Sequence, residues 1–205
     1  VEATDNGCTI PARTEVKATI NSVPTINSTI EGSICGSGSV KLTATASAGA
    51  TINWYTDPTT SVISGTGATF NTPTLTATTT YYVGAVTSSG CNTTSRIAVA
   101  AVVNNASTIA FTSGTQNPTI CSGAPIQSTV YTFGGSATNA TIDKLPAGLS
   151  ATVNTTAKTV TISGNPTAGG TYTITTVGHN APCTEASITG TVTITPNVTI
   201  AAFSP

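Results

Sequence analysis

Cysteine is the residue type in this chain with the clearest chemistry, and it occurs at Cys8, Cys35, Cys91, Cys121 and Cys183. No two C-x-x-C pairs and no histidine cluster accompany these residues, so a zinc site is not indicated. No Lys, Arg or His adjoins Cys35 or Cys91, so neither has the positive surroundings of a reactive thiolate. We therefore predict disulfide bonds, which place the protein in an oxidising compartment.

Side chains for acid–base or nucleophilic catalysis are few and scattered. His179, the only histidine, stands in a Gly-His-Asn-Ala-Pro turn, and we interpret it as a surface residue. A triad needs a base, a carboxylate and a nucleophile together, and glycoside hydrolysis needs paired carboxylates. A calcium site needs clustered oxygen ligands, which neither Asp57 nor Asp143 has nearby in sequence. We predict no catalytic residue, no metal site and no cofactor. The acidic residues are Glu2, Asp5, Glu15, Glu31, Asp57, Asp143 and Glu185.

The composition of the 205 residues indicates an all-β protein. Charged residues make up 6% and apolar residues 38%, well below the usual share of charge, and threonine takes much of their place. Thr, Val, Ile and Tyr favour strands, whereas the strong helix formers are scarce. The net charge is −1 and the six Lys and Arg residues are dispersed, so nucleic acid is not an expected partner. No apolar run approaches the ~20 residues of a membrane span, and no signal peptide opens the chain, so we expect a mature or internal segment that is not membrane-embedded.

Alternating apolar and polar segments bounded by Gly, Pro, Asn and Ser predict short strands. No helical pattern separates them, so the spacing favours β-sandwiches of about seven strands each. The expected strands cover residues 39–47, 51–56, 78–87, 96–103, 126–133, 151–154, 159–163, 170–177 and 186–195.

Internal repeats define the module boundaries. Residues 7–24, 90–104 and 182–196 each contain a cysteine, a polar stretch and an alternating strand that ends near Asn or Pro. We interpret each as the last strand of a module. Residues 34–38 and 120–123 form a second matching pair, with a cysteine in a turn of small residues just before a strand.

These repeats predict four segments. Residues 1–24 would be the terminal strand of a preceding module, 25–104 and 105–196 two complete sandwiches, and 197–205 the start of a following module. The expected disulfides are Cys35–Cys91 and Cys121–Cys183, each closing one sandwich at one end, while Cys8 would find its partner in the preceding module. Trp54, Tyr81 and Tyr172 are the predicted core aromatic residues.

Two stretches carry a family resemblance. TPTLTATTTYYV at 72–83, followed by Ser-Gly-Cys at 89–91, resembles the Ig-like repeats of giant cell-surface proteins in gliding Bacteroidetes. LPAGLS at 145–150 with ISGNPTAGGTY at 162–172 resembles the PKD-like repeats of the same proteins. The resemblance implies tandem Ig-like and PKD-like antiparallel β-sandwiches in an extended array, exported by the type IX secretion system. It offers no catalytic residues.

The resulting expectation is a non-catalytic, disulfide-stapled spacer in a long filamentous adhesin of the bacterial cell surface, used in attachment or gliding motility. Neighbouring modules of the same chain are the expected partners, and a surface polysaccharide or an abiotic surface is a candidate ligand. The alternative is an accessory or carbohydrate-binding module of a secreted enzyme, which would need an exposed aromatic platform. A receptor-like, protein-binding module would instead need an exposed apolar patch.

Overall fold

The computed structural model describes residues 4–5, 8–9 and 15–196. The chain divides into two compact units. The first comprises Val1–Ile30, Thr43–Phe70 and Tyr81–Val99, and the second comprises Glu31–Leu42, Asn71–Thr80 and Ala100–Pro205. A short antiparallel pair, β1 (Thr4–Asp5) and β2 (Cys8–Thr9), precedes the sandwiches.

The strands up to residue 104 form two sheets, one ordered β4-β10-β9-β6-β7 and the other β3-β5-β8. Alternation places their side chains: in Lys41–Ala46, Leu42 and Ala44 are buried while Lys41 and Thr45 are exposed. The strands are β3 (Ile26–Ile30), β4 (Gly32–Cys35), β5 (Lys41–Ala46), β6 (Thr51–Tyr55), β7 (Gly65–Thr66), β8 (Thr69–Asn71), β9 (Thr79–Val86) and β10 (Ile97–Asn104).

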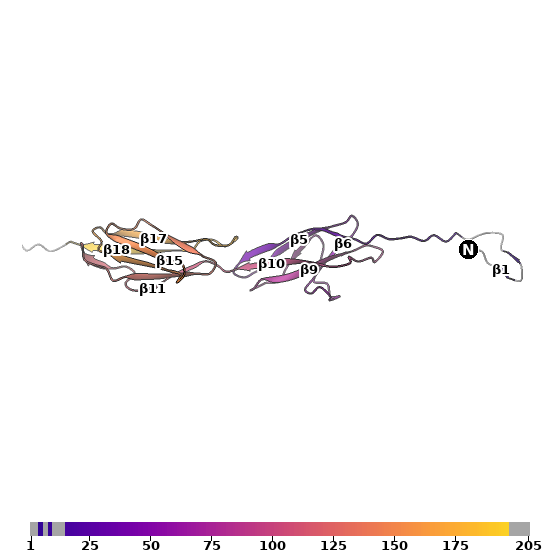
Figure 1. The fold of residues 1–205 in the computed structure, drawn as a ribbon, viewed down its shortest axis with the longest axis horizontal. Coiled ribbons are helices and arrows are strands. Elements are labelled where there is room, and N and C mark those ends of the chain that lie inside the picture. The colour runs from indigo at the N-terminus through magenta and orange to yellow at the C-terminus, as the bar shows by residue number, and fades with distance from the viewer. Residues whose placement is uncertain (1–3, 6–7, 10–14, 197–205) are drawn as a thin grey trace, which may run out of the picture. The chain divides into compact units, whose positions relative to one another are not determined.

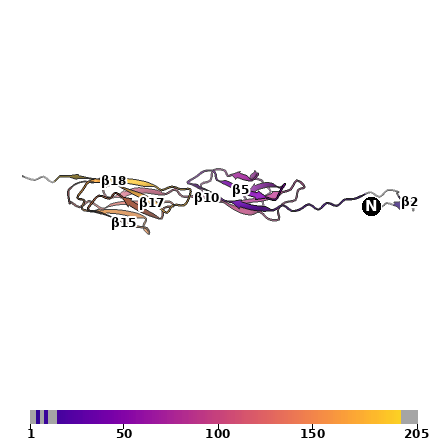
Figure 2. The same cartoon turned by 90° about the horizontal axis from the view of Figure 1, so that it is seen from above.

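The strands after residue 104 repeat this plan. One sheet has the order β12-β18-β17-β14 and the other β11-β13-β16-β15. Figure 1 shows β17 and β18 in one layer and β11 in the other, and Figure 2 shows β18 and β15 on opposite sides. The strands are β11 (Thr108–Ser113), β12 (Thr119–Cys121), β13 (Thr129–Gly134), β14 (Asn139–Asp143), β15 (Leu149–Asn154), β16 (Thr159–Gly164), β17 (Gly170–Val177) and β18 (Ser187–Thr195).

The core of the second sandwich lies between its two sheets and is contributed by both. Removal of these apolar side chains from water is the main favourable term in folding. The central residues of this core are Tyr131, Phe133, Val160 and Ile162 from one sheet and Tyr172, Ile174 and Val192 from the other.

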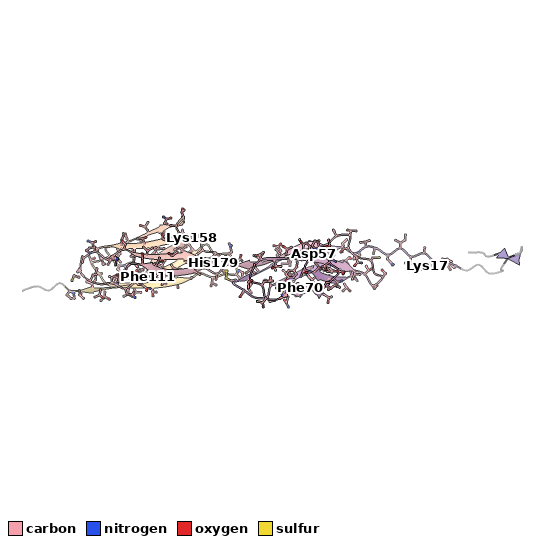
Figure 3. The ribbon with its side chains drawn as sticks, turned by 90° about the horizontal axis from the view of Figure 1, so that it is seen from below. Lys17, Asp57, Phe70, Phe111, Lys158 and His179 are labelled. Atoms are coloured by element: carbon pink, nitrogen blue, oxygen red, sulfur yellow. A yellow bond between two sulfur atoms is a disulfide. The ribbon has the colours of Figure 1, made fainter. Side chains whose placement is uncertain are left out.

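An aromatic cluster fills the first unit's core. Phe70, labelled in Figure 3, stacks on Trp54 with ring centroids 5.6 Å apart and meets Tyr81 edge-on at 5.2 Å. Trp54 is fully buried, and its indole nitrogen donates to the Gly67 carbonyl oxygen at 2.9 Å, so its one polar group is satisfied.

All nine predicted strands are present, and among the described residues no helix occurs. The prediction of purely antiparallel sandwiches needs one correction, because β4 pairs with β10 and β12 with β18 in parallel. Sequence pattern alone does not reveal these short strands, Gly-Ser-Ile-Cys and Thr-Ile-Cys, because each is only three or four residues long and runs directly into a turn of small residues.

Residues 15–24 run without strand partners, and Lys17 lies on this segment (Figure 3). The strand predicted here would pair within a preceding module, so it stays a prediction, and residues 197–205 lie outside the described part.

Candidate functional site

A disulfide joins Cys35 to Cys183, with 4.9 Å between their Cα atoms and both residues in the second unit. Cys91 and Cys121 have free thiols. The predicted bonds Cys35–Cys91 and Cys121–Cys183 are therefore wrong. The side chain of Cys8, in β2, lies outside the described residues, so its unpaired state stays a prediction.

Strand pairing explains why Cys121 and Cys183 do not meet. Cys121 is the last residue of β12 and pairs with Thr195, the last residue of β18. Cys183 comes four residues before Ser187, the first residue of that same strand. A strand of nine residues is about 30 Å long, whereas bonded cysteines need Cα atoms within about 7 Å. The two cysteines belong to opposite ends of the sandwich.

The same geometry separates Cys35 from Cys91. Cys35 pairs with Asn104, the last residue of the eight-residue strand β10. Cys91 precedes the first residue of β10 and is held at the end of β9, where Thr87 N donates to the Cys91 carbonyl oxygen at 2.9 Å. Because these cysteines flank the two ends of one strand, they cannot bridge.

Hydrogen bonds surround the observed disulfide. The Gly36 amide donates to the Asn104 carbonyl oxygen at 2.8 Å, and the Asn104 side-chain amide donates to the Ala181 carbonyl oxygen at 2.7 Å. Cys183 is 3% exposed, and its amide donates to the Asn180 carbonyl oxygen at 2.9 Å. The bond thus lies in a largely buried, hydrogen-bonded setting rather than on an open surface.

The two free cysteines are both more exposed than the bonded Cys183. Cys121 is exposed, in a turn closed by the Ala124 amide, which donates to its carbonyl oxygen at 3.1 Å. Cys91 is half-buried, and its amide donates to the Thr87 hydroxyl oxygen at 3.0 Å. Neither of these two cysteines is buried in a core.

The predicted core aromatics Trp54, Tyr81 and Tyr172 are all buried in the structure. Tyr172 forms a hydrogen bond that sequence reasoning missed, because its hydroxyl lies 2.9 Å from that of Tyr131 on the opposite sheet. Burial raises the pKa of both hydroxyls. Burial also raises the pKa of Tyr81.

A small cavity of about 230 Å³ lies beside β9 in the first unit. It is lined by Tyr55, Arg96 and the 92–95 segment, and the Arg96 guanidinium covers the Tyr55 ring at 3.3 Å from the centroid. Arg96 also donates to the backbone carbonyl oxygen of Asp57 at 2.8 Å. Arg96 thus covers the aromatic face that a ligand would need, and it lines the cavity as a structural contact.

Of the other polar residues considered in the sequence, those within residues 15–196 are not assembled into a reactive group. His179 is half-buried beside Thr184 and Glu185, and its Nδ1 has no hydrogen-bond partner. Asp57 accepts hydrogen bonds from the Thr59 hydroxyl and amide, which hold the pKa of its carboxyl below the ordinary value. Within residues 15–196, no three His, Cys, Asp or Glu side chains are grouped as metal ligands.

The described part of the chain contains no helix long and apolar enough to cross a membrane.

Comparison with known proteins identifies the fold of the first sandwich. Residues 22–104 match the model of a domain family described as "Ig-like domain CHU_C associated". No curated protein sequence matches the chain.

Solved structures extend the likeness to the rest of the chain. A titin I-band fragment is 15% identical, with 86% of this chain and 67% of that chain covered and a TM-score of 0.53. A marsupial T cell receptor is 11% identical, with 88% and 74% covered and a TM-score of 0.54. At such identities the similarity establishes the fold alone, which is the Ig-like β-sandwich.

Proposed function

We propose that this chain is a non-catalytic structural segment of a long extracellular adhesin, in which disulfide-stapled Ig-like modules act as a spacer between the cell surface and the attachment site. The source would be a gliding bacterium that exports the parent protein by type IX secretion. The neighbours in the array would be further modules of the same kind, and the array would contact a surface polysaccharide or an abiotic surface.

The observation that carries the proposal is the Cys35–Cys183 bond. It joins a cysteine of the Ig-like domain at 22–104 to one that precedes the last strand of the following sandwich. A disulfide of this kind persists in oxidising surroundings such as the cell exterior. It adds no reactive group, but it holds 148 residues of chain length against extension, which suits a spacer under tension.

A sugar-binding accessory module is the alternative, and it needs several exposed aromatic rings. Among the described residues Phe111, at 37% exposure, is the one aromatic side chain with a large exposed fraction. Its ring also packs edge-on against Tyr131. A glycan array separates the two functions, because binding by the oxidised chain that is lost in Phe111→Ala would favour the sugar-binding module.

Small-angle scattering tests the spacer role directly. A compact protein of this length would have a radius of gyration of about 17 Å. We expect the oxidised chain to exceed this value clearly, since a spacer must separate its ends. A value near that of a compact globule would contradict the proposal.

A further inference from the structure

The two sandwiches carry their cysteines at equivalent positions. In each, a short strand pairs in parallel with the last strand and ends in cysteine: Cys35 opposite Asn104, and Cys121 opposite Thr195. A glycine with positive φ follows in both turns, Gly36 at 80° and Gly123 at 77°. We call these two positions, Cys35 and Cys121, the exit cysteines, because they lie where the last strand of their sandwich ends.

The other two cysteines are equivalent as well. Cys91 lies in the connection between β9 and β10, and Cys183 in the connection between β17 and β18. Each precedes the last strand of its sandwich by a few residues. We call Cys91 and Cys183 the hairpin cysteines, and they lie at the opposite end of the last strand from the exit cysteine.

The observed disulfide therefore follows a rule. It joins the exit cysteine of one sandwich, Cys35, to the hairpin cysteine of the next one along the chain, Cys183. Cys121 and Cys91 occupy the same two kinds of position, and both are free in the structure. The bonded pair shows that an exit cysteine bonds to a hairpin cysteine of the next sandwich. A free cysteine by itself would not show what kind of partner it has.

We propose that Cys121 forms a disulfide with the hairpin cysteine of a following Ig-like sandwich, and that Cys91 forms one with the exit cysteine of a preceding sandwich. Each junction of the array then has one covalent staple of the Cys35–Cys183 type. The inference rests on the proposed function only in assuming that further modules flank this segment.

The chemistry of each staple is thiol–disulfide exchange. Two S–H bonds are lost and one S–S bond forms, and the two electrons and two hydrogens pass to the disulfide of an oxidant, which becomes two thiols. The oxidant is the same class of disulfide that forms Cys35–Cys183. The exposed position of Cys121 and the half-buried position of Cys91 make both thiols accessible to it.

A tandem chain recreates the missing junction. A second copy of residues 24–196 is inserted after Pro196 of the full chain, in a Cys8→Ser background. Three residues then separate the last residue of β18, Thr195, from the first residue of β3, Ile26. This equals the three-residue connection between β10 and β11. In the tandem chain, the sandwich that contains the first copy's Cys121 is followed by another sandwich, as the sandwich that contains Cys35 is in the original chain.

The tandem chain is oxidised with oxidised glutathione and mapped by non-reducing peptide mass spectrometry. We expect Cys121 of the first copy to be linked to Cys91 of the second. The number of free thiols per folded chain should fall from four to two, because each copy contributes two free cysteines before the staple forms. Cys35–Cys183 in both copies serves as the internal control for folding and for the oxidant.

Two variants of the first copy control for position. Cys121→Ser should leave the second copy's Cys91 free. Adding Thr119→Cys to that variant places an exposed thiol two residues earlier on the same strand face, about 7 Å away, and should not restore the bond.

Free Cys121 and Cys91 at the new junction, with Cys35–Cys183 formed in both copies, would overturn the inference. A Cys121–Cys183 bond within one copy would overturn it equally. Small-angle scattering on the same tandem chain distinguishes the disulfide inference from the spacer function. An extended chain that lacks the Cys121–Cys91 bond refutes only the disulfide inference. A stapled but compact chain refutes the spacer role.

Discussion

Two buried tyrosine hydroxyls of the second sandwich act as a pair. Tyr131 and Tyr172 reach across the core from opposite sheets, and their hydroxyls satisfy each other at 2.9 Å. The exposed fraction of each of these two tyrosines is 1% or less. A hydroxyl left alone in this position would be desolvated without compensation, so each tyrosine depends on the other.

Tyr172→Phe should therefore lower the free energy of unfolding by about 1–3 kcal/mol, the cost of leaving the Tyr131 hydroxyl buried and unpaired. The double variant Tyr131→Phe/Tyr172→Phe should cost less than the sum of the two single changes, because it removes both polar groups. Urea unfolding followed by circular dichroism measures this. Tyr82→Phe, at a half-buried position, is the control and should change little. Additive losses would contradict the pairing.

Alkaline pH should destabilise the fold through the same residues. Their pKa values are raised by burial above the value of about 10 for an unfolded tyrosine. A raised pKa contributes stability that is complete below pH ~10 and is lost as the pH rises further, because the unfolded chain then releases its protons first. Unfolding midpoints between pH 8 and 11, with free thiols alkylated, should fall steeply above pH 10. The double Phe variant should flatten this fall, and an unchanged slope would refute the assignment.

At the scale of elements, the contact between Tyr131 and Tyr172 depends on one small residue of β18. Gly190 stands directly opposite Tyr172, and the tyrosine ring lies over it. A Cβ at residue 190 would collide with the Tyr172 ring and come within 2.8 Å of the Tyr131 hydroxyl. The tyrosine pair is thus possible only because the neighbouring strand has no side chain here.

Gly190→Ala should consequently destabilise the protein by about 1–3 kcal/mol, the usual cost of overpacking a core. Thermal unfolding of the oxidised protein provides the measurement. Gly170→Ala is the matched control in β17, since its Cβ would meet only Pro146 at an ordinary 3.5 Å. Equal effects of the two changes would show that the cost comes from loss of glycine rather than from the tyrosine.

At the scale of the whole molecule, the disulfide decides how much chain can be extended. Residues 35 and 183 are 148 positions apart, so tension applied at the two ends bypasses the chain between them. The bond leaves about 57 of the 205 residues free to extend, which corresponds to about 200 Å of contour at ~3.5 Å per residue.

Single-molecule pulling on alkylated protein should show this limit. We expect about 200 Å of total contour in oxidised protein and about 720 Å after reduction. Cys183→Ser should behave as the reduced chain, and Cys91→Ser as the natural oxidised chain. A contour of about 300 Å would instead match bonds Cys35–Cys91 and Cys121–Cys183, which would leave about 87 residues free to extend.

Local sequence pattern was sufficient for nine of the sixteen sandwich strands and for the core aromatics, but not for the shorter strands such as β4 and β12. Alternation in residues 170–177 predicts β17 with its observed bounds, and Tyr172 falls on its buried face. The Tyr131–Tyr172 contact was not predictable in this way, because it depends on how two sheets pack face to face. The same is true of Gly190, whose importance follows from the strand register alone.

The cysteines show most clearly what the sequence determined and what only the tertiary structure decided. Their repeated spacing determined that the chain contains two comparable modules and that disulfides are the expected chemistry. The tertiary structure alone decided the partners, because β4 and β12 each run parallel to the last strand and carry their cysteine to its far end. Sequence spacing says which cysteines are equivalent, but only the direction of strand pairing says which end of a sandwich each one reaches. Because of that direction, the disulfide links Cys35 to Cys183 and does not lie within one module as predicted.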